Sequence, residues 1–208
     1  MIASALSCLF GTLYATCWPA VIVSFSIFLY LIIYIENFKL NPYKYIFLWG
    51  VMLYSCLYYW VFFPILQFNN NSIPIALLIS SVFIILCAQF PLIIYFITKK
   101  TGSNYFFLPR LIIIWGISEW IISLNSISFP WFLIGYSMTK SPLMALAPYG
   151  GVYLVSITTL LIALLCVKAL NNKNIITNLN IIFIIFASCI IISKLPSWTN
   201  KNSNIDVA

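Results

Sequence analysis

The stretch IALLISSVFIILCAQFPLIIYFIT, residues 75–98, decides the fold class of this protein. It contains no charged residue. It is also longer than the about 20 mostly apolar residues that a helix needs to cross a bilayer. A segment of this kind predicts a membrane-spanning helix. Similar apolar runs recur on both sides of it, so the sequence predicts an all-α integral membrane protein, a polytopic helical bundle.

The composition of the whole chain supports this prediction. Its 208 residues are 63% hydrophobic and 6% charged, with a mean hydropathy of +1.08, whereas a soluble domain carries about 25% charged residues. The chain therefore cannot present a solvated surface of ordinary size. Its net charge of +7 would favour nucleic-acid binding in a soluble protein. Here the basic residues lie between apolar runs, so we interpret them as topology signals and expect no nucleic-acid partner.

The apolar runs predict about seven transmembrane helices. They cover residues 2–17, 20–35, 45–66, 75–98, 108–124, 148–168 and 175–192. The first run is short, and it breaks at Trp18-Pro19. Residues 1–193 would then form a transmembrane helical domain, and residues 194–208 a tail on the outer face.

The basic residues orient this bundle. Alternate connections carry Lys39, Lys44, Lys99, Lys100, Arg110, Lys168 and Lys173, whereas the opposite connections hold only Lys140. Because cytoplasmic loops of membrane proteins are enriched in Lys and Arg, we expect the basic connections in the cytoplasm. Seven spans then place the N-terminus in the cytoplasm and the C-terminus on the outer, non-cytoplasmic side of the membrane.

Cysteine and histidine give no sign of a metal or cofactor site. The six cysteines form no CxxC pair and lie in or beside apolar runs, and the chain has no histidine. A buried cysteine usually behaves as a small hydrophobic residue. We therefore expect no cofactor and no metal.

Glu119 is an acidic residue inside the run 108–124, about 16 Å past Leu108 at 1.5 Å per helical residue. A charge at such depth costs about 2.5–3.5 kcal/mol, and residues of this kind usually face the bundle interior. Arg110 points to the opposite helix face, so we expect Glu119 to meet a tyrosine, a backbone group, water or a proton. Trp115 lies one turn earlier on the same face. Glu119 is either a structural hydrogen-bonding residue or a polar point beside a lipid or substrate path.

The segment SFPWFLIGYS, residues 128–137, does not suit a spanning helix. Pro130 disfavours helix at the residue before it, and Gly135 permits a positive φ or a close approach of backbones. Trp131 and Tyr136 suit a membrane interface, where an aromatic ring has an apolar body and a polar edge. The segment is either a lipid-anchored outer loop or a functional element at the membrane surface.

Residues 119–156 resemble the membrane domain of bacterial apolipoprotein N-acyltransferases. The motifs that carry the resemblance are Glu119-Trp120, Phe129-Pro130-Trp131, Gly135-Tyr136-Ser137, Pro142-Leu143, Ala147-Pro148 and Gly151-Val152-Tyr153 followed by Val155-Ser156. Each motif alone is weak, but the ordered set fits without gaps. Fainter matches are Trp18-Pro19, Gly50, Trp60-Val61 and residues 205–208, which look like the first strand of the family's soluble domain.

This resemblance implies an acyltransferase of lipoprotein biosynthesis in the inner membrane. Members of the family pass an acyl chain from a phospholipid, through a thioester, to the α-amino group of the lipidated N-terminal cysteine of an apolipoprotein. The implied partners are a phospholipid acyl donor and a diacylglyceryl apolipoprotein acceptor. The residues implied to line the lipid or substrate path are Glu119, Phe129, Pro130, Trp131, Gly135 and Tyr136.

The family chemistry implies a Cys nucleophile, a Glu base and a Lys in a nitrilase-like domain outside the membrane. Residues 193–208 contain no Cys and no Glu, so we expect no catalytic residue in this chain and no activity from it alone. Two interpretations stay open. The chain is the membrane half of an enzyme, paired with a separate or missing nitrilase-like half, or it is a non-catalytic membrane remnant or lipid-binding scaffold. A small transporter that uses Glu119 is a third, less favoured alternative.

Overall fold

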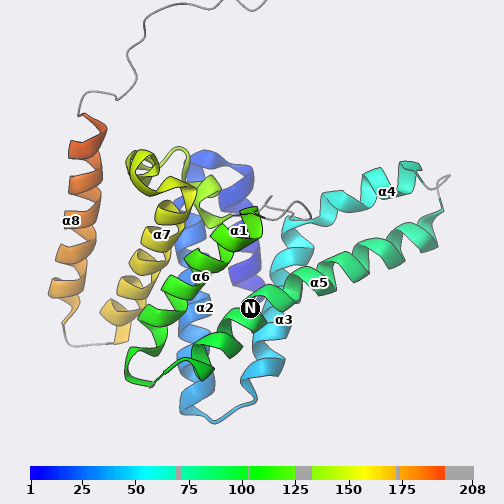
Figure 1. The fold of residues 1–208 in the computed structure, drawn as a ribbon, viewed down its shortest axis with the longest axis horizontal. Helices are drawn as coiled ribbons and strands as arrows, with labels where there is room; N and C mark the ends of the chain where they lie inside the picture. The colour runs from blue at the N-terminus through cyan, green and yellow to red at the C-terminus, as the bar shows by residue number, and fades with distance from the viewer. Residues whose placement is uncertain (69–71, 103, 125–132, 172–173, 195–208) are drawn as a thin grey trace, which may run out of the picture.

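The computed structural model describes residues 1–68, 72–102, 104–124, 133–171 and 174–194, and within these ranges the chain forms helices and no strand (Figure 1). The α-helices are α1 (Ile2–Leu13), α2 (Pro19–Asn37), α3 (Pro42–Leu57), α4 (Phe62–Phe68), α5 (Ile73–Lys100), α6 (Phe107–Leu124), α7 (Ala147–Asn171) and α8 (Ile175–Ser193). The short 3-10 helices are η1 (Ala15–Cys17), η2 (Tyr59–Val61), η3 (Asn104–Phe106), η4 (Ile134–Met138) and η5 (Pro142–Leu146). The predicted all-α membrane fold is confirmed.

Five helices of the described part are long and apolar enough to cross a membrane, or six if a bent pair counts as one span. The five are α2, α5, α6, α7 (extended by η5) and α8. The remaining apolar helix, α1, has 12 residues, which correspond to about 18 Å. This length is less than the about 30 Å of the hydrocarbon core, so the predicted run 2–17 does not form a complete span in the structure.

The predicted third span is not one straight helix. After α3 the chain passes through η2 into α4, and the axis bends by 58°. Pro64 lies in the first turn of α4, and a continuous helix would press its ring against the carbonyl of Trp60. The bend carries α4 and the first half of α5 sideways, away from the other helices (Figure 1).

An aromatic cluster packs the centre of the bundle. Phe28 of α2 stacks on Trp49 of α3 with ring centroids 3.8 Å apart, and Trp115 of α6 meets Phe25 and Phe28 edge-on. The two tryptophans are buried. Because large aromatic side chains fill much volume with few rotatable bonds, this cluster holds α2, α3 and α6 in fixed positions.

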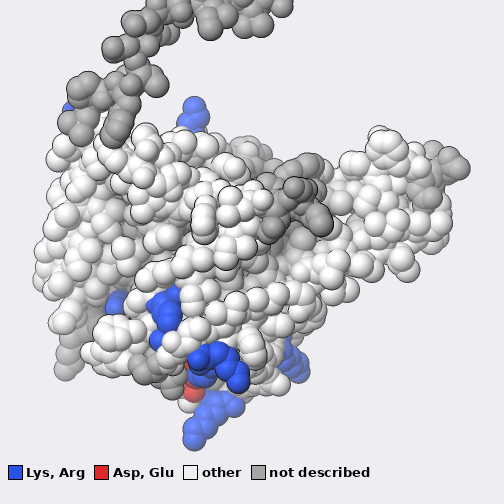
Figure 2. All heavy atoms as spheres, in the orientation of Figure 1, with Lys and Arg blue, Asp and Glu red and all other residues white. Residues whose placement is uncertain are grey.

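The basic residues are distributed unevenly between the two ends of the bundle. The last turns of α2, α5 and α7 and the first turns of α3, α6 and α8 all lie at one end of the bundle (Figure 1), which we call the basic end. Its described basic residues are Lys39, Lys44, Lys99, Lys100, Arg110 and Lys168. Most of the basic side chains visible in Figure 2 gather at this end, although basic atoms also show at the opposite end. The opposite end holds η4 and η5.

Candidate functional site

The carboxyl group of Glu119 joins α6 to the segment that follows it. Its Oε1 atom accepts a hydrogen bond from Trp115 Nε1 at 3.1 Å and another from the backbone N–H of Ile134 at 3.2 Å. Glu119 is 2% exposed. A buried backbone N–H requires a partner, so the carboxyl group fixes the first residue of η4 against α6.

The second carboxyl oxygen of Glu119, Oε2, differs from Oε1 in its hydrogen bonding. Oε2 is buried, and it has no hydrogen-bond partner within the described ranges. The hydroxyl of Ser156 is a hydrogen-bonding neighbour of the same carboxyl group, and it also lies 3.2 Å from the Val152 carbonyl oxygen, to which it donates. A buried polar atom without a partner is uncommon in native proteins.

Gly135 connects η4 to α7 through a hydrogen bond and a close backbone contact. Its backbone N–H donates to Ser156 Oγ at 2.8 Å, and η4 packs so closely that an added Cβ would lie 2.3 Å from the Val152 carbonyl oxygen. Gly135 has no positive φ. Of the two roles expected for this glycine, close approach is therefore the one that the structure uses.

The start of α7 bends at a glycine pair. Gly151 has φ 65°, which side-chain-bearing residues rarely adopt. Beyond the bend, the hydroxyl groups of Tyr153 and Ser123 lie 2.6 Å apart, so α7 also bonds to the end of α6. The end of the bundle opposite the basic end is thus held by contacts among α6, η4 and α7.

A cavity of about 360 Å³ lies beside Glu119, between α3, α5 and α6. Its lining includes Tyr54, Tyr58, Cys87, Phe90, Glu119, Ile122 and Leu133. Leu86 and Ile93 of α5 also line it and are 65% and 53% exposed, so the cavity borders the surface of the chain that faces lipid. The lining is apolar apart from a few groups, and it includes no Lys or Arg.

The structure brings together three of the residues predicted for the path. Glu119 of α6 and Gly135 of η4 are buried, and Tyr136, which follows Gly135 in η4, is 53% exposed. The other three, Phe129, Pro130 and Trp131, lie outside the described residues. Trp115 shares the buried face with Glu119, as predicted. Arg110 does not point toward Glu119, and its Nε donates to the Thr98 carbonyl oxygen.

Two partners in the site were missed by the sequence reasoning. Ser156 was noted as part of a motif, but its bond to Gly135 was not foreseen. The Ile134 N–H was foreseen only as an unspecified backbone group. A signal for Ser156 exists, because a serine inside an apolar run often hydrogen-bonds to a neighbouring segment. No comparable pattern identifies Tyr54 and Tyr58 as lining the cavity.

Comparison with known proteins gives a consistent result. Residues 4–165 match the family described as the apolipoprotein N-acyltransferase N-terminal domain. A curated apolipoprotein N-acyltransferase of Coxiella burnetii is 30% identical over 156 residues, which cover 69% of this chain and 31% of the relative. Another, from Wigglesworthia glossinidia brevipalpis, is 30% identical over 177 residues, covering 81% of this chain and 34% of the relative. The chain thus matches about a third of the length of these relatives.

Proposed function

Because the chain belongs to the apolipoprotein N-acyltransferase N-terminal domain family, we propose that it forms the membrane part of such an acyltransferase. In this proposal, residues 1–193 are the transmembrane helical domain, and the transferred acyl chain comes from a phospholipid. The acceptor is the N-terminal cysteine amino group of a diacylglyceryl apolipoprotein. The groups that form and break the thioester come from a nitrilase-like domain outside residues 1–208, on the same chain or on a separate one.

The observation that carries this proposal is the arrangement of Glu119 between η4 and an apolar cavity. The cavity volume of about 360 Å³ falls within the range of about 300–1,000 Å³ that small-molecule sites occupy. Its apolar lining suits acyl chains. Glu119 also lines this cavity, so its carboxyl group would lie beside the bound lipid.

The end that carries η4 would face the catalytic domain. We place the basic end in the cytoplasm, because cytoplasmic connections are enriched in Lys and Arg. The end with η4 and η5, and the end of α8, would then face the periplasm of a bacterial inner membrane. A cytoplasmic N-terminus stays a prediction, since α1 is too short to reach from one membrane surface to the other.

The proposed function is tested by joining residues 1–208 to a nitrilase-like catalytic domain of this family. The joined protein should transfer an acyl group from phospholipid to a diacylglyceryl lipopeptide, measured by mass spectrometry of the lipopeptide. We expect Tyr136→Ala to lower the rate severalfold, because Tyr136 is 53% exposed beside the buried η4 residues. The Trp131→Ala variant should act in the same direction.

Tyr105→Ala is the matched control, since Tyr105 is 85% exposed and lies in η3, between α5 and α6 at the basic end. Its rate should equal that of the unchanged protein. Equal rates for the Tyr136, Trp131 and Tyr105 variants would show that residues 128–137 serve only as a membrane anchor and have no role in acyl transfer. Absence of transfer by the joined protein, once its catalytic domain is known to be folded, would favour a non-catalytic lipid-binding scaffold.

Occupation of the cavity is a separate prediction. A phospholipid with a photoactivatable acyl chain should label peptides of α5 and α6 that line the cavity. Cys87→Trp should lower this labelling severalfold, because Cys87 lines the cavity and the larger ring fills it. Peptide mapping by mass spectrometry measures the labelling.

Two controls separate the cavity from the general lipid-facing surface. Cys166 lines a different apolar groove, between α2 and α7, so Cys166→Trp should leave the labelling of α6 unchanged. Labelling of α8 should not respond to either variant, because few of its residues are buried. Unchanged labelling of α6 in the Cys87→Trp variant would show that the acyl chain does not occupy this cavity.

A further inference from the structure

The basic end carries more positive charge than the chain itself can neutralise. Its six described basic residues, named above, face a single described acidic residue at this end, Glu36. The other described acidic residue, Glu119, lies inside the bundle near the opposite end. The described residues of the basic end therefore carry a net positive charge.

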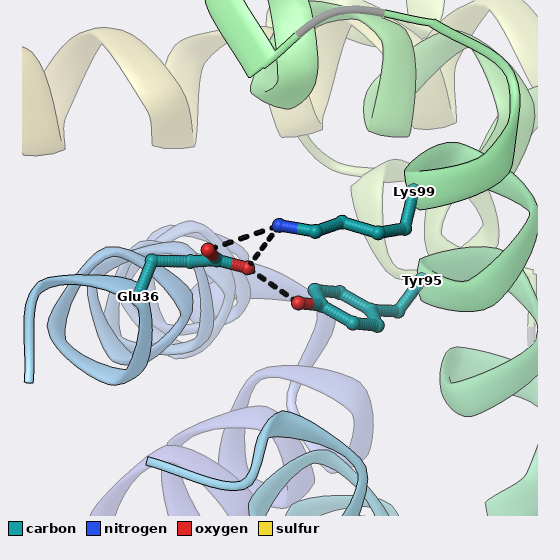
Figure 3. Close-up of polar contacts among 3 residues, drawn as sticks. All are labelled: Glu36, Tyr95 and Lys99. Carbon is teal, nitrogen blue, oxygen red and sulfur yellow. Dashed lines mark hydrogen bonds and ion pairs between the residues drawn. The ribbon is translucent and has the colours of Figure 1, made fainter. Parts of the chain in front are cut away.

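Glu36 is already engaged (Figure 3). Its carboxylate accepts hydrogen bonds from Lys99 Nζ at 2.8 and 3.0 Å and another from the Tyr95 hydroxyl. This contact joins the end of α2 to the end of α5. Glu36 thus balances the charge of Lys99, and Lys39, Lys44, Lys100 and Lys168 have no described acidic partner.

The remaining basic side chains are placed at the edge of the apolar spans. Lys44 lies in the first turn of α3, Lys100 is the last residue of α5, and Lys168 lies in the last turn of α7. All three are exposed. Arg110, in the first turn of α6, is held by its bond to the Thr98 carbonyl. In a membrane these positions would be level with the headgroups of the nearer leaflet, because the apolar part of each helix begins directly beside them.

We propose that Lys39, Lys44, Lys100 and Lys168 form a surface that binds anionic phospholipid headgroups in the leaflet at the basic end. Clusters of Lys and Arg immediately beside transmembrane helices attract anionic lipids, and the attraction falls off within a Debye length. The phosphate groups of that leaflet lie at this depth in the membrane. A soluble polyanion would have to approach from the aqueous side, so the geometry favours the lipid.

The test measures lipid selectivity and needs no acyl transfer. The full chain is placed in vesicles with trace spin-labelled phosphatidylglycerol or phosphatidylcholine, and the motionally restricted fraction gives the relative association constant. Phosphatidylglycerol should be preferred by at least about threefold at low salt, and the preference should shrink in about 1 M salt. The double variant Lys44→Gln, Lys100→Gln should lose about half of this preference or more.

The matched control is Lys140→Gln, Lys194→Gln, which removes two exposed lysines from the opposite end and should leave the preference unchanged. Thermal unfolding of both double variants shows whether they remain folded. Equal association of the two lipids, or equal losses in the two double variants, would overturn the proposal. Binding of a single-stranded RNA oligonucleotide without any lipid preference would also overturn it, by assigning the surface to a soluble polyanion.

Discussion

Replacing Gly135 by alanine should destabilise the bundle by about 2–4 kcal/mol, one of the two largest effects that we expect from a single substitution. The new Cβ would lie 2.3 Å from the backbone carbonyl oxygen of Val152 and 2.6 Å from its Cγ2 atom. A backbone carbonyl within a helix cannot move aside without moving the helix. Either η4 shifts away from α7 or α7 is distorted, and in both cases the hydrogen bond from Gly135 to Ser156 weakens.

The measurement is the free energy of unfolding in detergent micelles, followed by circular dichroism. Gly102→Ala is a matched control, because its Cβ would lie 2.4 Å from the end of the Arg110 side chain. That side chain can rotate, so we expect a change below about 1 kcal/mol. If both alanine variants unfold like the unchanged protein, η4 does not pack on α7 as closely as the structure shows.

Replacing Glu119 by leucine is the second large change, with an expected cost of about 1–3 kcal/mol. Leucine removes the acceptor from two buried donors, Trp115 Nε1 and the Ile134 N–H. Inside the bundle no water replaces the lost acceptor. Glu119→Gln keeps a carbonyl oxygen in the same place, so it should change the unfolding free energy by less than about 0.5 kcal/mol.

The same unfolding assay measures both Glu119 variants, and a double-mutant cycle with Trp115→Phe isolates the hydrogen bond between the two side chains. We expect the Leu and Phe substitutions to be less than additive, because each removes the same bond. A leucine variant as stable as the glutamine variant would contradict a structural role for the carboxyl group. The carboxyl would then be retained for the cavity alone.

Much of the bundle was predictable because the signals are local. The runs 75–98, 108–124 and 175–192 match α5, α6 and α8 within a few residues, since apolar length and flanking polar residues determine where a span begins and ends. Glu119 could be assigned to a buried face by the cost of a charge in the bilayer. The bend after α3 was missed, although Pro64 gave a local reason to expect it.

The partners within the site were less predictable. Glu119 was expected to meet a backbone group or another polar group, but that this is the Ile134 N–H depends on how the chain returns to α6. The alternative roles of Gly135 were also open from sequence. Positive φ and close approach both require glycine, and only the 2.3 Å distance to Val152 decides between them.

The sequence by itself determined that this is a polytopic helical membrane protein with a buried acid inside one of its spans, and its motifs indicated the family. These properties follow from the free energy of transferring single residues and single helices into lipid, which each segment carries independently. Only the tertiary structure decided that η4 is held between α6 and α7, that α4 and α5 lean outward, and that a cavity lies beside Glu119. Those features depend on the distances between helices, because packing and hydrogen bonds arise only where segments meet.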